Sequence, residues 1–425
     1  MAGPNLDIIH LILDFIYRDE EGVVDRESLA TASRISRSWR QPAQTRLFHT
    51  VIINSRGRLL AFSKSAPRSS VRGRQLRAMV LGLTFYLSGH SAILGVSPSR
   101  SLLERDMLSL LPTLGNLYEL GVCSYAPEIS LSAQRGLASS KMPPIRTLAV
   151  LYLGEPPDRN HRVFFSLLSS MPTVERARLV GKGTYQWSTS TPLTSPPPVA
   201  LKEFRVDLRH SQPSVTGAEL EWFLDHSKET LEILCLYDLV LDRTMSNFIL
   251  SFAPRLVSFH VSSSGHSDLV HLPTWIKAMA QLKELVIRND LPSADCFRAI
   301  TDLPRLIVAL PSTLGHFGFA VDSHAALDST FAQISEWRRH LGSPLSTLTI
   351  VLTSPEPMAR KGEVPGVERL RLYHYKDKDI LFALVSAAHD FISLLTQLDD
   401  PNVTLQALPS PIRRLSTRSY DCGEG

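Results

Sequence analysis

The chain has 425 residues, 44% of them hydrophobic and 20% charged, a globular composition long enough for two or three packing units. Its four cysteines are far apart, which excludes a C-x-x-C metal clamp and a dense disulfide framework and favours an intracellular, cytoplasmic or nuclear location. The acidic first 27 residues argue against a signal or transit peptide, and the longest apolar stretch, 78–87, is too short to cross a bilayer.

Three short helices are predicted at the N-terminus. Residues 7–16 place Ile8, Leu11, Ile12 and Phe15 on one helical face, which Ile9, Leu13 and Ile16 widen. Asp25 is a predicted cap of a second helix around Leu29 and Ala32. Ser33 or Ser36 is a predicted cap of a third helix, which contains Trp39, with Pro42 restricting the chain beyond it. About forty residues build little core, so such a unit relies on a partner or on the following domain.

The first fifty residues resemble fungal F-box domains. The resemblance is carried by Asp7-Ile8-Ile9 with Ile12-Leu13, by Leu29-Ala30-Thr31-Ala32-Ser33-Arg34-Ile35-Ser36-Arg37-Ser38-Trp39-Arg40, and by Ala43-Gln44-Thr45-Arg46-Leu47-Phe48. It implies an adaptor that joins a Skp-type protein, and hence a cullin-RING ubiquitin ligase, to a protein substrate. It further implies adaptor-binding residues, namely Ile8, Ile9, Ile12, Leu13, Ile16, Leu29, Ile35 and Trp39. The chain departs from the family at Pro4-Asn5-Leu6, where F-box domains usually have Leu-Pro. The alternative is that these apolar residues only pack against the rest of the chain.

A basic segment follows this unit. Residues 28–103 contain twelve Lys or Arg and no Asp or Glu. Aromatic residues are not interleaved as a base-stacking surface requires, so we expect an acidic protein partner or a solvated face rather than nucleic acid. We assign residues 51–116 to a basic connecting segment and a first repeat, which Leu76-Met79-Leu81 could open.

An apolar pattern, L-x-x-L-x-L with conservative replacements, then recurs with a mean period of about 28 residues, typical of leucine-rich repeats. Each copy ends in the alternation of a strand with one buried face. The copies are Leu117-Leu120-Val122, Ile145-Leu148-Val150, Val174-Ala177-Leu179, Leu201-Phe204-Val206, Leu231-Leu234-Leu236, Leu256-Phe259-Val261, Leu282-Leu285-Ile287, Leu314-Phe317-Phe319, Leu345-Leu348-Ile350 and Val367-Leu370-Leu372.

Helical spacing separates the copies, in 217–226, in 243–252, around Trp275-Ile276 and Met279, and in 331–341. We therefore predict an α/β fold, a leucine-rich-repeat-like solenoid with a curved parallel sheet over residues 117–395, preceded by the F-box-like unit at 1–50 and followed by a tail at 396–425. The Asn or Cys that ties neighbouring turns in many such repeats is missing at Tyr125, Leu153, Arg209, Leu239, Ser264 and Asp290. Residues 154–160, 181–199 and 353–366 are predicted loops. An ordinary α/β domain is the alternative.

The polar residues between the apolar positions are predicted to face the concave side of the sheet and to bind a protein target. They are Arg176, Arg178, Arg205, Asp207, Tyr237, His260, Glu284, Arg288, Arg369, Arg371 and Tyr373, with Glu203 among them. A solvated sheet face is the alternative for each.

Catalytic patterns are fragmentary. Gly89-His90-Ser91-Ala92-Ile93 lacks the small final residue of a nucleophile elbow, and Gly181-Lys182-Gly183-Thr184 is not a phosphate-binding loop. The 373–379 segment has no second ligand set, so we assign no metal and no cofactor. We expect a non-enzymatic substrate receptor of a Skp-cullin-F-box ligase, without nucleic-acid or membrane binding. The alternative is a repeat-based interaction scaffold without ligase association.

Overall fold

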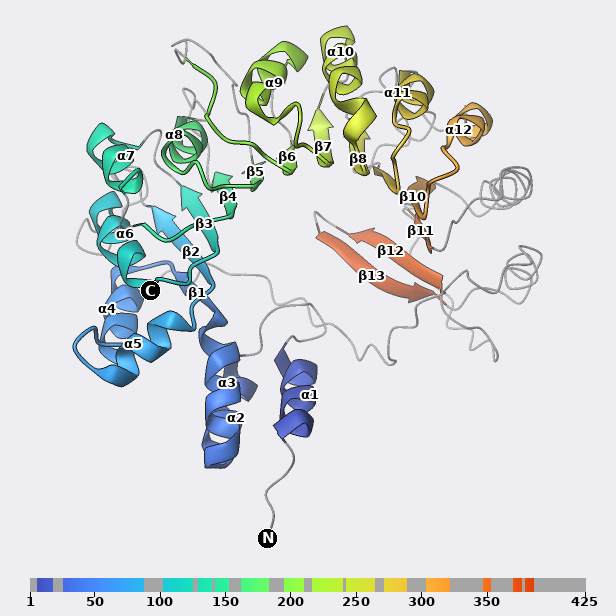
Figure 1. Cartoon of the computed structure of the whole chain (residues 1–425). Coiled ribbons are helices and arrows are strands. Elements are labelled where there is room, and N and C mark those ends of the chain that lie inside the picture. The colour runs from blue at the N-terminus through green and yellow to red at the C-terminus, as the bar shows by residue number, and fades with distance from the viewer. Residues whose placement is uncertain are drawn as a thin grey trace, which may run out of the picture.

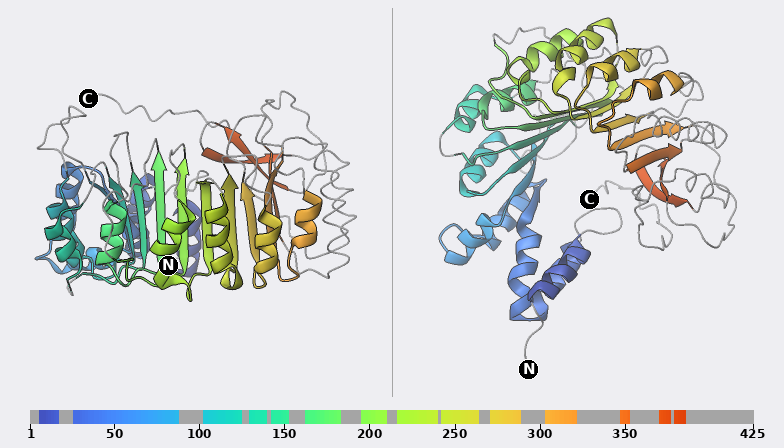
Figure 2. Two further views of the ribbon diagram at one scale, coloured as in Figure 1. Left: turned by 90° about the horizontal axis from the view of Figure 1, so that it is seen from above. Right: turned by 45° about the vertical axis from the view of Figure 1, so that its right-hand side comes forward.

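The computed structural model describes residues 6–17, 26–87, 102–124, 129–139, 142–152, 162–182, 195–209, 216–239, 242–263, 271–288, 303–321, 347–352, 370–376 and 379–385. Within these residues one thirteen-stranded sheet runs in sequence order from β1 to β13. All neighbouring strands are parallel except β12 and β13, which are antiparallel. The sheet curves, with the helices between the strands on its outer side (Figures 1 and 2).

The strands are short and evenly spaced along the chain. Their bounds are β1 Thr50–Ile53, β2 Gly82–Leu87, β3 Glu119–Ser124, β4 Thr147–Tyr152, β5 Arg176–Lys182, β6 Glu203–Arg209, β7 Ile233–Leu239, β8 Ser258–Ser263, β9 Glu284–Arg288, β10 His316–Val321, β11 Thr347–Leu352, β12 Leu370–Lys376 and β13 Asp379–Val385. Every one of the ten predicted apolar copies from Leu117 onward leads into or contains one strand, β3 to β12. The predicted α/β solenoid with a parallel sheet is confirmed.

The helices lie between strands, with the first three ahead of the sheet. Their bounds are α1 Leu6–Tyr17, α2 Arg26–Ile35, α3 Arg37–His49, α4 Arg56–Ser65, α5 Val71–Ala78, α6 Glu104–Leu110, α7 Leu131–Leu137, α8 Arg162–Ser170, α9 Gly217–Phe223, α10 Arg243–Phe252, α11 Leu272–Ala278 and α12 Leu303–Ala309. The helices predicted around 217–226, 243–252 and 275–279 are present as α9, α10 and α11. The one predicted at 331–341 lies outside the described residues, as do most of the three predicted loops.

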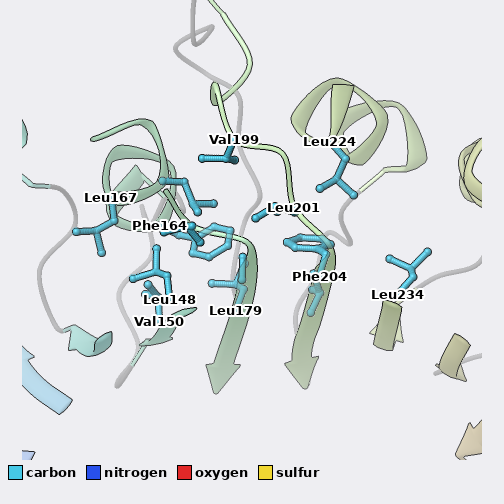
Figure 3. Packing of buried hydrophobic residues seen from close by; sticks show 14 of the residues in the cluster. Leu148, Val150, Phe164, Leu167, Leu179, Val199, Leu201, Phe204, Leu224 and Leu234 are labelled. Carbon is cyan, nitrogen blue, oxygen red and sulfur yellow. The ribbon is translucent and has the colours of Figure 1, made fainter. Parts of the chain in front are cut away.

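The core lies between the sheet and the outer helices. Side chains in register across adjacent strands, such as Leu148, Ala177 and Phe204, form continuous buried rows. Phe204 packs near Phe164 of α8 and Phe223 of α9, with ring centroids 6.4 and 5.2 Å apart. Figure 3 shows Phe164 and Phe204 among these buried side chains. Each repeat thus buries its apolar face only because its neighbours are stacked on it.

Hydrogen bonds from backbone amides and threonine hydroxyls join neighbouring repeats, which lack the Asn or Cys that joins the turns of many leucine-rich repeats. The carbonyl of Lys202 accepts from the amides of Glu232 (2.9 Å) and Ile233 (3.0 Å), and the same double acceptance recurs from repeat to repeat. A threonine before three of the apolar copies adds a second tie. Thr230 Oγ1, for example, donates to the Leu201 carbonyl at 2.8 Å. Thr173 and Thr313 make the equivalent bonds to Ile145 and Leu282.

One prediction near the start of the sheet is corrected. Leu76 belongs to α5 and Met79 caps it, so Leu76-Met79-Leu81 opens no strand. Strand β2 begins two residues after the buried Val80 and buries Leu83, Phe85 and Leu87. Leu76 and Met79 are three residues apart because they lie on one face of a helix, and the same three-residue spacing begins the L-x-x-L-x-L pattern. Residues 51–116 also supply β1, β2 and α4 to α6 to the same sheet and helical layer.

Candidate functional site

The concave face of the sheet carries a polar surface on neighbouring strands β5 to β10. Strand register places Arg178 beside Arg205, Arg205 beside Cys235, and Cys235 beside His260. Buried core residues such as Leu179 alternate with these positions, so the two sets point to opposite faces of the sheet. This is the face on which the target-binding residues were predicted.

Arginines dominate the β5 and β6 part of this face. Arg176 Nε lies 3.8 Å from Glu203 Oε2, and Arg205 forms a close ion pair with the other oxygen of Glu203. Arg178 is exposed and is the register partner of Arg205, which places two guanidinium groups on adjacent strands. Glu203 compensates the charge of Arg205, which leaves Arg178 as the accessible cation of this register pair.

A cluster of hydrogen bonds and close polar contacts continues the polar surface across β7 to β10. The Tyr237 hydroxyl lies 3.0 Å from His260 Nδ1, and His260 Nε2 lies 3.2 Å from one carboxylate oxygen of Glu284. The other Glu284 oxygen lies 2.9 Å from His316 Nδ1, and Ser258 Oγ donates to the carboxylate at 2.6 Å. The contacts from His260, His316 and Ser258 hold the pKa of Glu284 well below its usual range, although its partial burial opposes them.

Several predicted target residues are less available than the strand alternation suggested. Asp207 and Tyr237 are buried, and His260 and Glu284 are partly buried because they contact each other across the strands. Tyr237 and His260 are therefore held in place by contacts within the sheet face and offer little accessible side-chain surface to a partner. The exposed cations Arg176 and Arg178 are its accessible part.

Four other predicted target residues have no described side chain. Arg288 ends β9 and lies opposite Ser262 in the register, and Arg371 and Tyr373 belong to β12. The side chains of these three, and the whole of Arg369, lie outside the described residues.

Three further side chains of this polar face were not predicted from the sequence. Ser258 and His316 occupy the same row of the register as Glu284, so the alternation rule applied to the β8 and β10 copies would have found both. Cys235 lies between Arg205 and His260 in the next row. Burial raises the pKa of its thiol to about 11, with the nearby Arg205 acting in the opposite direction.

The N-terminal helices α1, α2 and α3 form a small unit with a separate core, made of Ile9, Leu13, Leu29, Ala32 and Ala43. Three of these, Ile9, Leu13 and Leu29, were predicted on the adaptor-contact face, and that prediction is corrected. They are fully buried because α1 packs against α2 and α3. Trp39 is partly buried against the same core, and the side chain of Ile16 lies outside the described residues.

The opposite side of α1 is apolar and open. Ile8, Leu11 and Ile12 are 51%, 72% and 40% exposed, and Ile35 at the end of α2 is also exposed. Their spacing at i, i+3 and i+4 places the three α1 residues on one stripe. Helix α1 therefore exposes an apolar face that does not take part in the core of the three-helix unit.

Helix α3 joins this unit directly to the solenoid. It ends at His49, and β1 begins at Thr50 with no intervening linker. Arg46 of α3 donates to the backbone carbonyl of His10 in α1 at 3.1 Å. Pro42 lies inside α3, so its predicted restriction of the chain beyond this helix is wrong. Ser36 is the N-cap, but its hydroxyl contacts Ser38 Oγ rather than a helix amide.

No group of three or more His, Cys, Asp or Glu suited to a metal ion occurs in the described part of the chain. Among the helices of that part, none has both the length and the apolar character needed to span a membrane. The Gly89 to Ile93 segment lies outside the described residues.

Comparison with known proteins shows no match to any protein-family model and none to a curated protein. Solved structures give distant matches. The leucine-rich repeat-containing protein LegL7 from Legionella pneumophila is 12% identical over 84% of this chain and 93% of its own, with a TM-score of 0.36. TLR13 in a complex with ssRNA13 is 14% identical over 67% of this chain, with a TM-score of 0.28. This chain spans 38% of the TLR13 chain.

Proposed function

We propose that the chain is a non-enzymatic adaptor that joins two proteins, with the α1 face docking on a Skp-type adaptor and the concave sheet face holding a target. The observation that carries the proposal is the apolar stripe of Ile8, Leu11 and Ile12, exposed on a helix whose other side is already filled. Such a stripe is a liability in a free protein and a contact surface in a complex. The F-box resemblance of the first fifty residues supports a Skp-type occupant.

The direct connection between α3 and β1 supports the adaptor role. A flexible linker would leave the position of a bound target relative to the α1 face undefined. Because helix α3 runs directly into strand β1, the distance between the α1 face and the concave sheet face is set by the fold. The solenoid offers the second surface, where Arg176 and Arg178 are exposed near the Arg205–Glu203 ion pair. Arginine forks suit acidic or phosphorylated target segments.

Co-expression with a Skp-type adaptor and a cullin tests the docking half. The variant Ile8→Asp/Ile12→Asp should lose adaptor capture, because docking would bury two charges against an apolar surface. The control Leu131→Asp/Val308→Asp adds the same charge at two exposed apolar positions of the solenoid helices and should retain capture. If the unaltered, folded chain captures no adaptor, the alternative of a scaffold without ligase association replaces this proposal.

The target half is tested separately. Photo-crosslinkers at positions 176 and 178 should recover protein targets that crosslinkers at positions 135 and 243, on the outer helices, do not recover. Recovery of the same targets only from the outer positions would contradict a concave target site.

A further inference from the structure

The consecutive helices α4 and α5 with the turn between them, residues 56–78 and here called the α4–α5 hairpin, carry charge of one sign only. The hairpin carries seven cations and no carboxylate, in the middle of the acid-free stretch 28–103. None of the seven forms an ion pair within the described residues. They are Arg56, Arg58, Lys64, Arg68, Arg72, Arg74 and Arg77.

The turn between α4 and α5 is tightly packed and is bonded by two of the arginines. Gly73 packs so closely on the turn before α5 that an added Cβ would stand 1.9 Å from the Pro67 carbonyl oxygen. Arg77 Nε donates to the Ala66 carbonyl at 2.7 Å, and Arg74 Nη1 donates to the Ser69 carbonyl at 3.3 Å. Two guanidinium groups are therefore fixed around one turn by backbone acceptors, which carry no compensating full charge.

One of these cations is buried. Arg77 lies beneath the surface with its Cζ 5.1 Å from the centre of the Phe62 ring, and its Nη1 donates to Thr113 Oγ1 at 2.5 Å. Its charge is not neutralised by any carboxylate in the described residues, so it adds to the positive potential of the hairpin. Burial, and after it the like charge of Arg68, lowers the pKa of the Arg77 guanidinium from its ordinary value.

The exposed side of the hairpin is not purely charged. Leu60 of α4 is 55% exposed and Val71 of α5 is 64% exposed, so cations and apolar side chains share this surface. The hairpin's one aromatic residue, Phe62, is buried, which removes the stacking platform that single-stranded nucleic acids use. Six of the seven cations are arginines, whose planar forks bind carboxylates in pairs.

We propose that the α4–α5 hairpin binds an acidic protein segment, one in which Asp and Glu are interspersed with aliphatic residues. The cations match the carboxylates, and Leu60 and Val71 match the aliphatic side chains. Helix α5 contacts α3, so the bound segment would lie next to the three-helix unit (Figure 2, right). The inference does not rest on the proposed function, because it uses no residue of the α1 face or of the concave face.

The test is titration of the full chain with a fluorescent Glu/Asp/Leu peptide, followed by anisotropy. The variant Arg58→Gln/Lys64→Gln/Arg72→Gln should bind about tenfold more weakly, because three exposed ion pairs with the peptide are lost together. The control Arg135→Gln/Arg243→Gln/Lys277→Gln removes the same charge from exposed positions of α7, α10 and α11 and should bind within about twofold of the unaltered chain.

A charge-retaining variant separates recognition from folding. Arg58→Lys/Arg72→Lys should bind with an affinity between those of the unaltered chain and the Gln variant, since the positive charges remain while the paired hydrogen bonds of two guanidinium forks are lost. Three results would overturn the proposal: no peptide binding by the folded chain even at low salt, an equal loss in the control variant, or preferential binding of single-stranded RNA or duplex DNA over the peptide.

Discussion

Replacing Phe204 by Ala tests the packing that holds the concave face in place. Phe204 is fully buried on β6, and its ring forms a triangle with those of Phe164 and Phe223, at centroid distances of 6.4 and 5.2 Å. Removing a buried phenylalanine costs about 3 to 5 kcal/mol, and the neighbouring rings cannot easily close the cavity because α8 and α9 are both packed on the sheet. We expect the free energy of unfolding to fall by about 4 kcal/mol.

Urea unfolding followed by circular dichroism measures this change. Leu131→Ala is the matched control, because Leu131 is an exposed apolar residue of α7 and its loss should cost under about 0.5 kcal/mol. The solenoid couples neighbouring repeats, so the loss should appear as destabilisation of the repeats around β6 rather than as a local change at one residue. A decrease below about 1 kcal/mol for Phe204→Ala would refute the packing described here.

Three further predictions concern single groups of the solenoid. Glu284→Gln should destabilise the chain by about 1 to 2 kcal/mol near neutral pH, because contacts led by His260 lower the pKa of Glu284. The difference between the unfolding free energies of the two proteins should shrink as the pH falls below about 4.3, the usual glutamate value, and a difference independent of pH would contradict this. Thr230→Val should cost about 1 kcal/mol in thermal unfolding, since the Leu201 carbonyl loses a donor; no change would show the tie to be dispensable. Cys235 should resist iodoacetamide at pH 8 in the folded chain and react in urea, because burial raises its pKa to about 11; rapid native labelling by mass spectrometry would disprove this.

The repeating strands were predictable because each one needs three apolar residues at fixed spacing, whatever fills the loops between them. The ten copies from Leu117 onward therefore identified β3 to β12. Strand β13 was not found, since 379–385 is a nearly continuous apolar run without that spacing, and its antiparallel pairing ends the repeat. Strand β1 was hidden at the boundary with α3, where helix and strand share no intervening turn residue.

The candidate surfaces were only partly predictable. Alternation assigned Arg178 and His260 to the concave face, but the contact of His260 with Glu284 depends on the separation of strands that are distant in sequence. On α1 the apolar stripe is too wide for its pattern to separate Ile9 from Ile8. The positions of α2 and α3 decide that Ile9 is buried and Ile8 is exposed.

The central claim, that α1 is a docking face for a Skp-type adaptor, is tested most directly by site-specific photo-crosslinking. A benzophenone amino acid replaces Leu11, the most exposed residue of the apolar stripe, or Leu131 of α7 as the control position. With purified Skp-type adaptor, we predict a crosslink from position 11 and none from position 131. A complex that forms and crosslinks only through position 131 would contradict the docking face proposed here.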